Sequence, residues 1–112
     1  MAFNLRAEED ESIEISMFHP LDIVPGNIYW TTTEAGLKKI LEACIRKNIR
    51  LYNRSVIDEK YRLMLEKYMK EHGDVAVHIA NSGDHVHVEY GYIDWFKFEE
   101  RYKNSTIKEI VA

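Results

Sequence analysis

The chain of 112 residues has little cysteine, glycine and proline. Its single cysteine, Cys44, excludes an internal disulfide framework and any zinc finger built on cysteine ligands. With 5 glycines and no glycine-rich loop, a nucleotide-cradling loop is not expected. HExxH helices, nucleophile elbows and CxxC pairs are also missing from the sequence. These absences favour an interaction protein over an enzyme.

Long hydrophobic runs are missing as well. No apolar run approaches the roughly 20 residues that span a bilayer, and the N-terminus lacks the basic and then apolar pattern of a secretion signal. We therefore expect a soluble cytoplasmic protein without membrane contacts, in the host cytoplasm if a phage encodes it. The length and the hydrophobic content of 46% are those of one small globular domain.

Charge is unevenly distributed along the chain, whose net charge is -4. Glu8, Glu9, Asp10 and Glu11 follow one another, and such a run is typical of a solvated arm. The sequence thus divides into an acidic N-terminal arm at 1–11 and a single α+β domain at 12–112. Only the middle segment, 34–73, has an excess of basic residues, so nucleic acid is not the expected partner.

The segment 74–93 gives the clearest secondary-structure signal, a β-hairpin. Two runs alternate apolar and polar residues on either side of a turn cluster at 81–84. A two-residue loop would pair Ile79 with Val86, and a four-residue loop at 80–83 would pair Val77 with Val86. Both registers place the apolar sets of the two runs on one face.

Periodicity and capping signals predict the remaining elements. Helices are expected at 34–47, from a cap at Ser55 or Asp58 to about 72, and at 94–103. Strands are expected at 12–18, 27–31 and 49–56, with an edge strand or a loose tail at 105–112. Cys44 belongs to the apolar stripe of the first helix and is interpreted as a small buried hydrophobe. The predicted fold is a small two-layer α+β sandwich. Its mixed or antiparallel sheet would have about 4–6 strands. The 2–3 helices would cover this sheet, because helices of this length bury their apolar stripe against one.

The polar face of the hairpin carries His78, His85, His87 and Glu89. This face is either solvated or covered by a helix with its imidazoles hydrogen-bonded. Imidazole and carboxylate are also metal ligands, so one divalent metal ion at these four residues is the alternative to having no cofactor. A pH-sensing cluster is a further alternative, because histidine titrates near neutrality.

The triplet His85-Val86-His87 is similar to the motif that names the HUH endonucleases, which nick single-stranded DNA. In that family two histidines bind a divalent metal, and a tyrosine on a helix attacks a DNA phosphate. The resemblance implies that His85 and His87 are ligands, that His78 or Glu89 completes the set, and that Tyr102 is the nucleophile.

Surplus aromatic residues point instead to protein binding. Exposed Tyr and Trp serve as anchors of protein interfaces, and acidic surfaces speed association with basic sites. We therefore expect a small acidic protein that binds and inhibits or regulates a partner, of the immunity-protein or phage-inhibitor type. The partner would offer a basic or nucleic-acid-binding site, and a homodimer through the hairpin or the tail strand is a further expectation. The expected contact residues are Glu8, Glu9, Asp10, Glu11, Glu14, Tyr92, Asp94, Trp95, Glu99 and Glu100.

Overall fold

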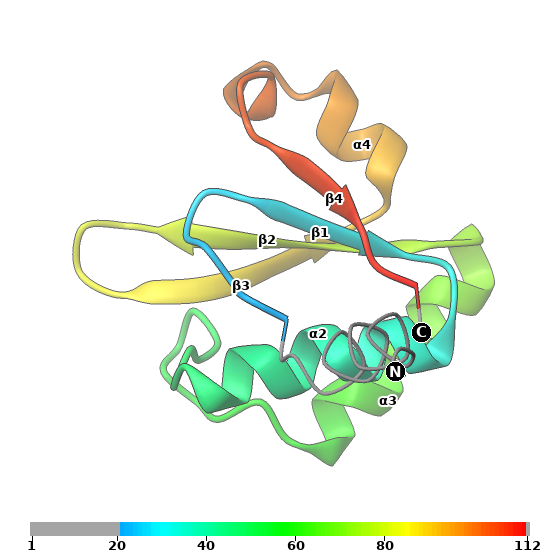
Figure 1. Cartoon of the computed structure of the whole chain (residues 1–112), viewed down its shortest axis with the longest axis horizontal. Coiled ribbons are helices and arrows are strands. Elements are labelled where there is room, and N and C mark those ends of the chain that lie inside the picture. The colour runs from blue at the N-terminus through cyan, green and yellow to red at the C-terminus, as the bar shows by residue number, and fades with distance from the viewer. Residues whose placement is uncertain (1–20, 112) are drawn as a thin grey trace, which may run out of the picture.

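The computed structural model describes residues 21–111 and contains a four-stranded mixed sheet with three helices (Figure 1). The strands are β1 (Ile28–Thr31), β2 (Val75–Asn81), β3 (Val86–Gly91) and β4 (Ile107–Glu109), in the order β3-β2-β1-β4. Strand β4 runs parallel to β1, and the other pairs are antiparallel. The predicted α+β class is confirmed. The arm at 1–11 and the strand expected at 12–18 lie outside the described residues.

Helix α2 (Glu34–Arg46) forms where the sequence predicts it. The Thr33 hydroxyl caps its first turn by accepting a hydrogen bond of 3.0 Å from the Gly36 N–H. The helix ends at Lys47, and the following Asn48 adopts the left-handed conformation with φ 59°.

Helix α3 (Glu59–His72) is also defined by local signals. The Asp58 carboxylate accepts a hydrogen bond of 2.9 Å from the Tyr61 N–H at its start. Gly73, with φ 88°, ends the helix by donating its N–H to the Met69 carbonyl at 2.7 Å. No helix within residues 21–111 has both the length and the apolar character that crossing a bilayer requires.

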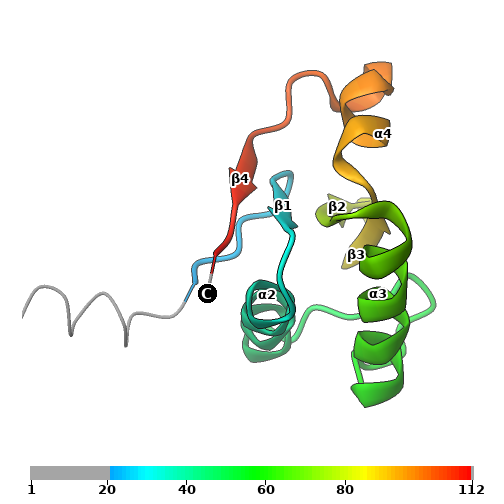
Figure 2. The same ribbon diagram turned by 90° about the vertical axis from the view of Figure 1, so that its right-hand side faces the viewer.

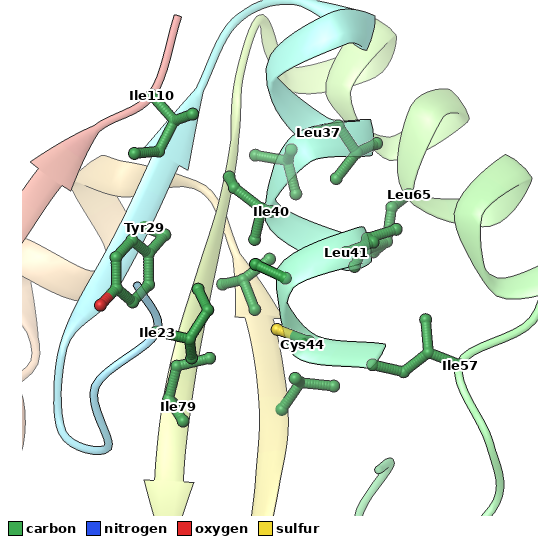
Figure 3. Packing of buried hydrophobic residues seen from close by; sticks show 14 of the residues in the cluster. Ile23, Tyr29, Leu37, Ile40, Leu41, Cys44, Ile57, Leu65, Ile79 and Ile110 are labelled. Carbon is green, nitrogen blue, oxygen red and sulfur yellow. The ribbon is translucent and has the colours of Figure 1, made fainter. Parts of the chain in front are cut away.

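The main core lies between one face of the sheet and helices α2 and α3 (Figure 3). Leu37, Ile40 and Cys44 of α2, Leu65 of α3 and Tyr29 of β1 are fully buried in this one cluster. The apolar stripe of α2 therefore faces the sheet, and Cys44 is the buried hydrophobe that its position predicts.

A third helix, α4 (Ile93–Phe98), packs on the opposite face of the sheet, as Figure 1 shows. The helix predicted at 94–103 is interrupted at Glu99, whose extended backbone (φ -76°, ψ 120°) separates α4 from the 3-10 turn η1 (Glu100–Tyr102). The buried side chains between α4 and the sheet form a second, smaller core. It consists of Ile28, Ala76, Ile93, Phe96 and Tyr102.

The prediction of a strand at 49–56 is wrong. Only Arg50 makes a bridge, pairing in parallel with His87 of β3. The chain then closes a turn on itself, because the Leu51 N–H bonds to the Ser55 carbonyl and the Arg54 N–H bonds to the Leu51 carbonyl. The alternation at 49–51 reflects packing of Ile49 and Leu51 against the core without strand pairing.

Both hairpin registers expected from the sequence are wrong, although the faces are right. Ile79 pairs with Val88, Val77 pairs with Tyr90, and the loop spans 82–85. The Asn81 side chain accepts a hydrogen bond of 3.0 Å from the Gly83 N–H within the turn. The observed loop ends two residues later in the chain than either expected loop. A shift by two residues preserves which side chains share a face.

Candidate functional site

The structure brings three of the predicted site residues together on the face that α4 partly covers. His78 of β2 lies directly opposite Glu89 of β3, with its Nδ1 2.9 Å from Glu89 Oε1. The Tyr102 hydroxyl donates to the same carboxylate oxygen at 2.8 Å. An ionised carboxylate only accepts, so Nδ1 of His78 carries the hydrogen.

Burial and hydrogen bonding set the protonation of this cluster. Burial alone would raise the pKa of Glu89, but the hydrogen bonds from His78 and Tyr102 outweigh it, and the pKa lies below its usual value. Burial, with the hydrogen bond to Glu89 acting in the same direction, raises the pKa of Tyr102 to about 12. The cluster therefore keeps Glu89 charged and Tyr102 protonated near neutrality, which is the opposite of what an activated tyrosine nucleophile needs.

His85 and His87 lie apart from this cluster, beside Tyr52. The ring centroids of His87 and Tyr52 are 4.9 Å apart, and His85 Nε2 lies 3.0 Å from the Tyr52 carbonyl oxygen. His87 is buried and lies opposite Ala80 of β2. In the part of the chain that the structure describes, no three His, Cys, Asp or Glu side chains form a group that could hold a metal ion.

The predicted acidic contacts that fall within the described residues lie on α4 and η1. Asp94 and Glu100 are exposed, and Trp95 and Glu99 are half-buried. Glu99 pairs with Arg101 at 3.7 Å, while Glu100 pairs with Lys103 at 2.5 Å. This surface is consequently mixed in charge rather than acidic. The remaining predicted contacts, Glu8, Glu9, Asp10, Glu11 and Glu14, lie outside the described residues.

Trp95 and Tyr92, the two predicted aromatic anchors, belong to different surfaces. Trp95 packs on Phe96 with centroids 5.0 Å apart, and the Arg101 guanidinium lies 5.8 Å from its ring. Tyr92 stacks on His72 of α3 at 4.9 Å with nearly parallel planes. On α4 itself the most exposed aromatic is Phe98, whose exposed fraction is 88%.

Tyr92 is part of a larger aromatic surface that the sequence did not reveal. Helix α3 lies beside β3, the edge strand of the sheet away from β4 (Figure 2). Five of the seven tyrosines lie on these two elements or next to them. We call this set the tyrosine edge; it consists of Tyr52, Tyr61, Tyr68, Tyr90 and Tyr92.

Aromatic contacts link four rings of the tyrosine edge, one of them through His72. Tyr90 makes edge-to-face contacts with Tyr61 at 6.3 Å and with Tyr68 at 5.2 Å. His72 lies 4.2 Å from Tyr68 and links it to Tyr92. Tyr52, with an exposed fraction of 70%, joins Tyr61 and Tyr90 around an open groove of about 430 Å³.

The backbone at this edge is also open. The Val88 N–H points outward and bonds to the Arg50 carbonyl, so by the two-residue repeat of a strand the N–H and carbonyl of Tyr90 point outward as well. Among residues 21–111, these two groups of Tyr90 have no hydrogen-bond partner. The groove therefore combines aromatic rings with a free donor and acceptor.

Comparison with family models, with curated proteins and with solved structures gave no match to this chain.

Proposed function

We propose that this chain is an interaction protein that binds a partner protein through the tyrosine edge and so inhibits or regulates it. One observation carries the proposal: the fold gathers five tyrosines, far apart in sequence, into one partly exposed surface beside a groove. Tyrosine supplies a large, stiff contact area with a polar tip, and for this reason it is enriched among the anchors of protein interfaces.

The free backbone groups of Tyr90 favour an extended segment as the part of the partner that binds. Such a segment can add to a strand edge, where main-chain hydrogen bonds give affinity and neighbouring pockets give specificity. Tyr61 and Tyr52 both line the groove and would contact the side chains of this segment. Exposed Met64 of α3 extends the apolar surface beyond the tyrosines.

A basic site on the partner remains part of the proposal. The tyrosine edge meets α4 at Tyr92, and Asp94 and Glu100 on the α4 side would face the basic groups of such a partner. Their alternation with Lys97, Arg101 and Lys103 makes this contribution secondary to the aromatic anchors. A homodimer through the hairpin or through β4 is a separate expectation, and light scattering would test it.

Affinity capture followed by a binding measurement on each recovered partner tests the proposal. Tyr52→Ala and Tyr90→Ala combined should weaken binding at least tenfold, because interface anchors each contribute about 1–2 kcal/mol or more. Phe98→Ala is the matched control, since it removes an exposed aromatic from another surface. Full affinity in the double variant, or a larger loss in the control, would overturn the proposal.

A further inference from the structure

Apart from the tyrosine edge, the structure has a cavity of about 490 Å³ beside the end of α2. It lies between the chain before β1, the segment after α2, and the turn of the β2–β3 hairpin. Four basic side chains line it: Lys47, Arg50, Arg54 and His85. Ile23, Ile49 and Val86 supply apolar walls, and among the described lining residues there is no carboxylate.

Two carboxylates hold two of these cations from outside the cavity. Asp22 lies 3.0 Å from Lys47 Nζ, and Asp84 pairs with the Arg54 guanidinium. Both ion pairs are largely exposed, so each stabilises the fold little and can yield to a competing anion. The excess of positive charge in the lining is therefore available to a ligand.

The charge of Arg50 is also available to a ligand. In the part of the chain that the structure describes, its guanidinium makes one hydrogen bond, a long one of 3.4 Å from Nη1 to the Arg54 carbonyl. It forms no ion pair with a described carboxylate. An arginine held at a cavity wall in this way presents a fork of donors that matches a phosphate group.

The backbone of Arg54 is strained at the same cavity. Its φ of 73° lies in the left-handed region, which glycine occupies freely and a long side chain does not. Asn48 also has a positive φ, but the end of α2 explains it. Arg54 takes this conformation inside the turn that the hydrogen bonds from Leu51 N–H to Ser55 and from Arg54 N–H to Leu51 close.

His85 adds a buried polar atom without a partner. The Tyr52 carbonyl only accepts, so Nε2 of His85 donates to it across 3.0 Å. The other nitrogen, Nδ1, is buried and has no hydrogen-bond partner among residues 21–111. Asp84 Oδ2 lies 3.7 Å from it. Because Nε2 holds the hydrogen of the neutral ring, Nδ1 is an acceptor, so His85 forms part of the cavity wall and does not hold the anion.

From these contacts we infer that the cavity binds a small phosphate-bearing organic molecule. Arg50, Arg54 and Lys47 hold the phosphate, and the apolar walls at Ile23, Ile49 and Val86 contact the organic part. The volume lies within the range of about 300–1,000 Å³ that is usual for small-molecule sites. A polynucleotide is the less favoured anion, because the net charge of the chain is -4. This inference does not rest on the tyrosine edge.

Calorimetric titration of the full chain with ADP, adenosine, pyrophosphate and a single-stranded oligothymidylate tests the inference. We expect ADP to bind with one-to-one stoichiometry, pyrophosphate to bind more weakly, and adenosine not to bind. Arg50→Gln and Arg54→Gly should each weaken ADP binding at least about tenfold, since each removes a charge-assisted hydrogen bond.

Two controls separate binding from folding. Lys103→Gln removes an equal charge just after η1, far along the chain from the cavity, and should leave ADP affinity unchanged. Arg54→Gly places glycine where the backbone is left-handed, so its thermal midpoint should not fall while binding is lost. Equal ADP affinity in all variants, or no binding of ADP or pyrophosphate, would overturn the inference. Binding of the oligonucleotide without binding of ADP would also overturn it and assign the cavity to nucleic acid.

Discussion

The hydroxyl of Tyr102 donates a hydrogen bond of 2.8 Å to Oε1 of Glu89, the same atom that accepts from His78. One carboxylate oxygen thereby joins the two strands of the hairpin to the turn that follows α4. The smaller core on this face, with Phe96 at its centre, is closed by this polar contact as well as by apolar packing.

Replacing Tyr102 with phenylalanine should destabilise the fold by about 1.5 kcal/mol, the lower end of the usual range for a hydrogen bond to a charged group, because Glu89 is partly exposed. The ring would still pack on Phe96 and His78, so the loss reports the hydroxyl alone. Urea unfolding measures the change. Tyr52→Phe removes the hydroxyl of an exposed ring and should change stability far less, and equal losses in the two variants would contradict this account.

Glu89 should make stability depend on pH in the acid range. Because its folded pKa lies below the unfolded value of about 4.3, its contribution is complete above that value and is lost as pH falls through the folded pKa. Glu89→Gln should therefore be less stable than the parent near pH 6, and the gap should close toward pH 3. Thermal unfolding across this range measures the gap. The exposed Glu100→Gln serves as control, and a gap that stays constant with pH would count against the assignment.

Gly36 should not tolerate alanine, although alanine is the better helix former by about 1 kcal/mol. A Cβ at this position would overlap the Thr31 side chain and lie 2.7 Å from the Ile110 carbonyl oxygen. The carbonyl belongs to the backbone and cannot rotate away, so we expect Gly36→Ala to lower the thermal midpoint. The neighbouring exposed Ala35→Gly should cost only the helix propensity, and a stabilised Gly36→Ala would refute the close approach.

Cys44 should be unreactive in the folded protein. Its side chain is fully buried, and burial raises the pKa of the thiol to about 12. A chromogenic disulfide reagent near pH 8 should therefore react slowly with the native chain and fast in concentrated guanidinium chloride. Rapid native reaction would show that α2 separates from the sheet far more often than its packing suggests.

Local signals were enough to predict the two long helices. Thr33, Asp58 and Gly73 act as caps through hydrogen bonds to neighbours in sequence, and the apolar stripes follow the helical repeat. The hairpin shows where such reasoning stops. Alternation establishes which residues share a face, but the register depends on side-chain bonds of Asn81 within the turn, which a pattern of apolar residues does not contain.

The candidate sites required knowledge of the tertiary arrangement. Tyr61 and Tyr90 meet because α3 lies beside the edge strand β3, and strand order could not be deduced from the sequence. The spacing of Tyr61, Tyr68 and His72 on one side of a helix was the available signal. Likewise, the excess of basic residues at 34–73 is visible in the sequence, but the cavity that Arg50 and Arg54 line depends on a turn in a segment where the sequence predicts a strand.

The parallel pairing of β4 with β1 has a consequence for how the chain folds. Ile28 and Ile107 are neighbours in the sheet but lie at nearly opposite ends of the described sequence. The β2–β3 pairing joins residues close in sequence and closes a short loop, whereas the β1–β4 pairing must wait for a long one. During synthesis the ribosome releases β4 after every other described element. The sheet is therefore completed from its hairpin outward, and β1 keeps an unpaired edge until the chain's last described strand arrives.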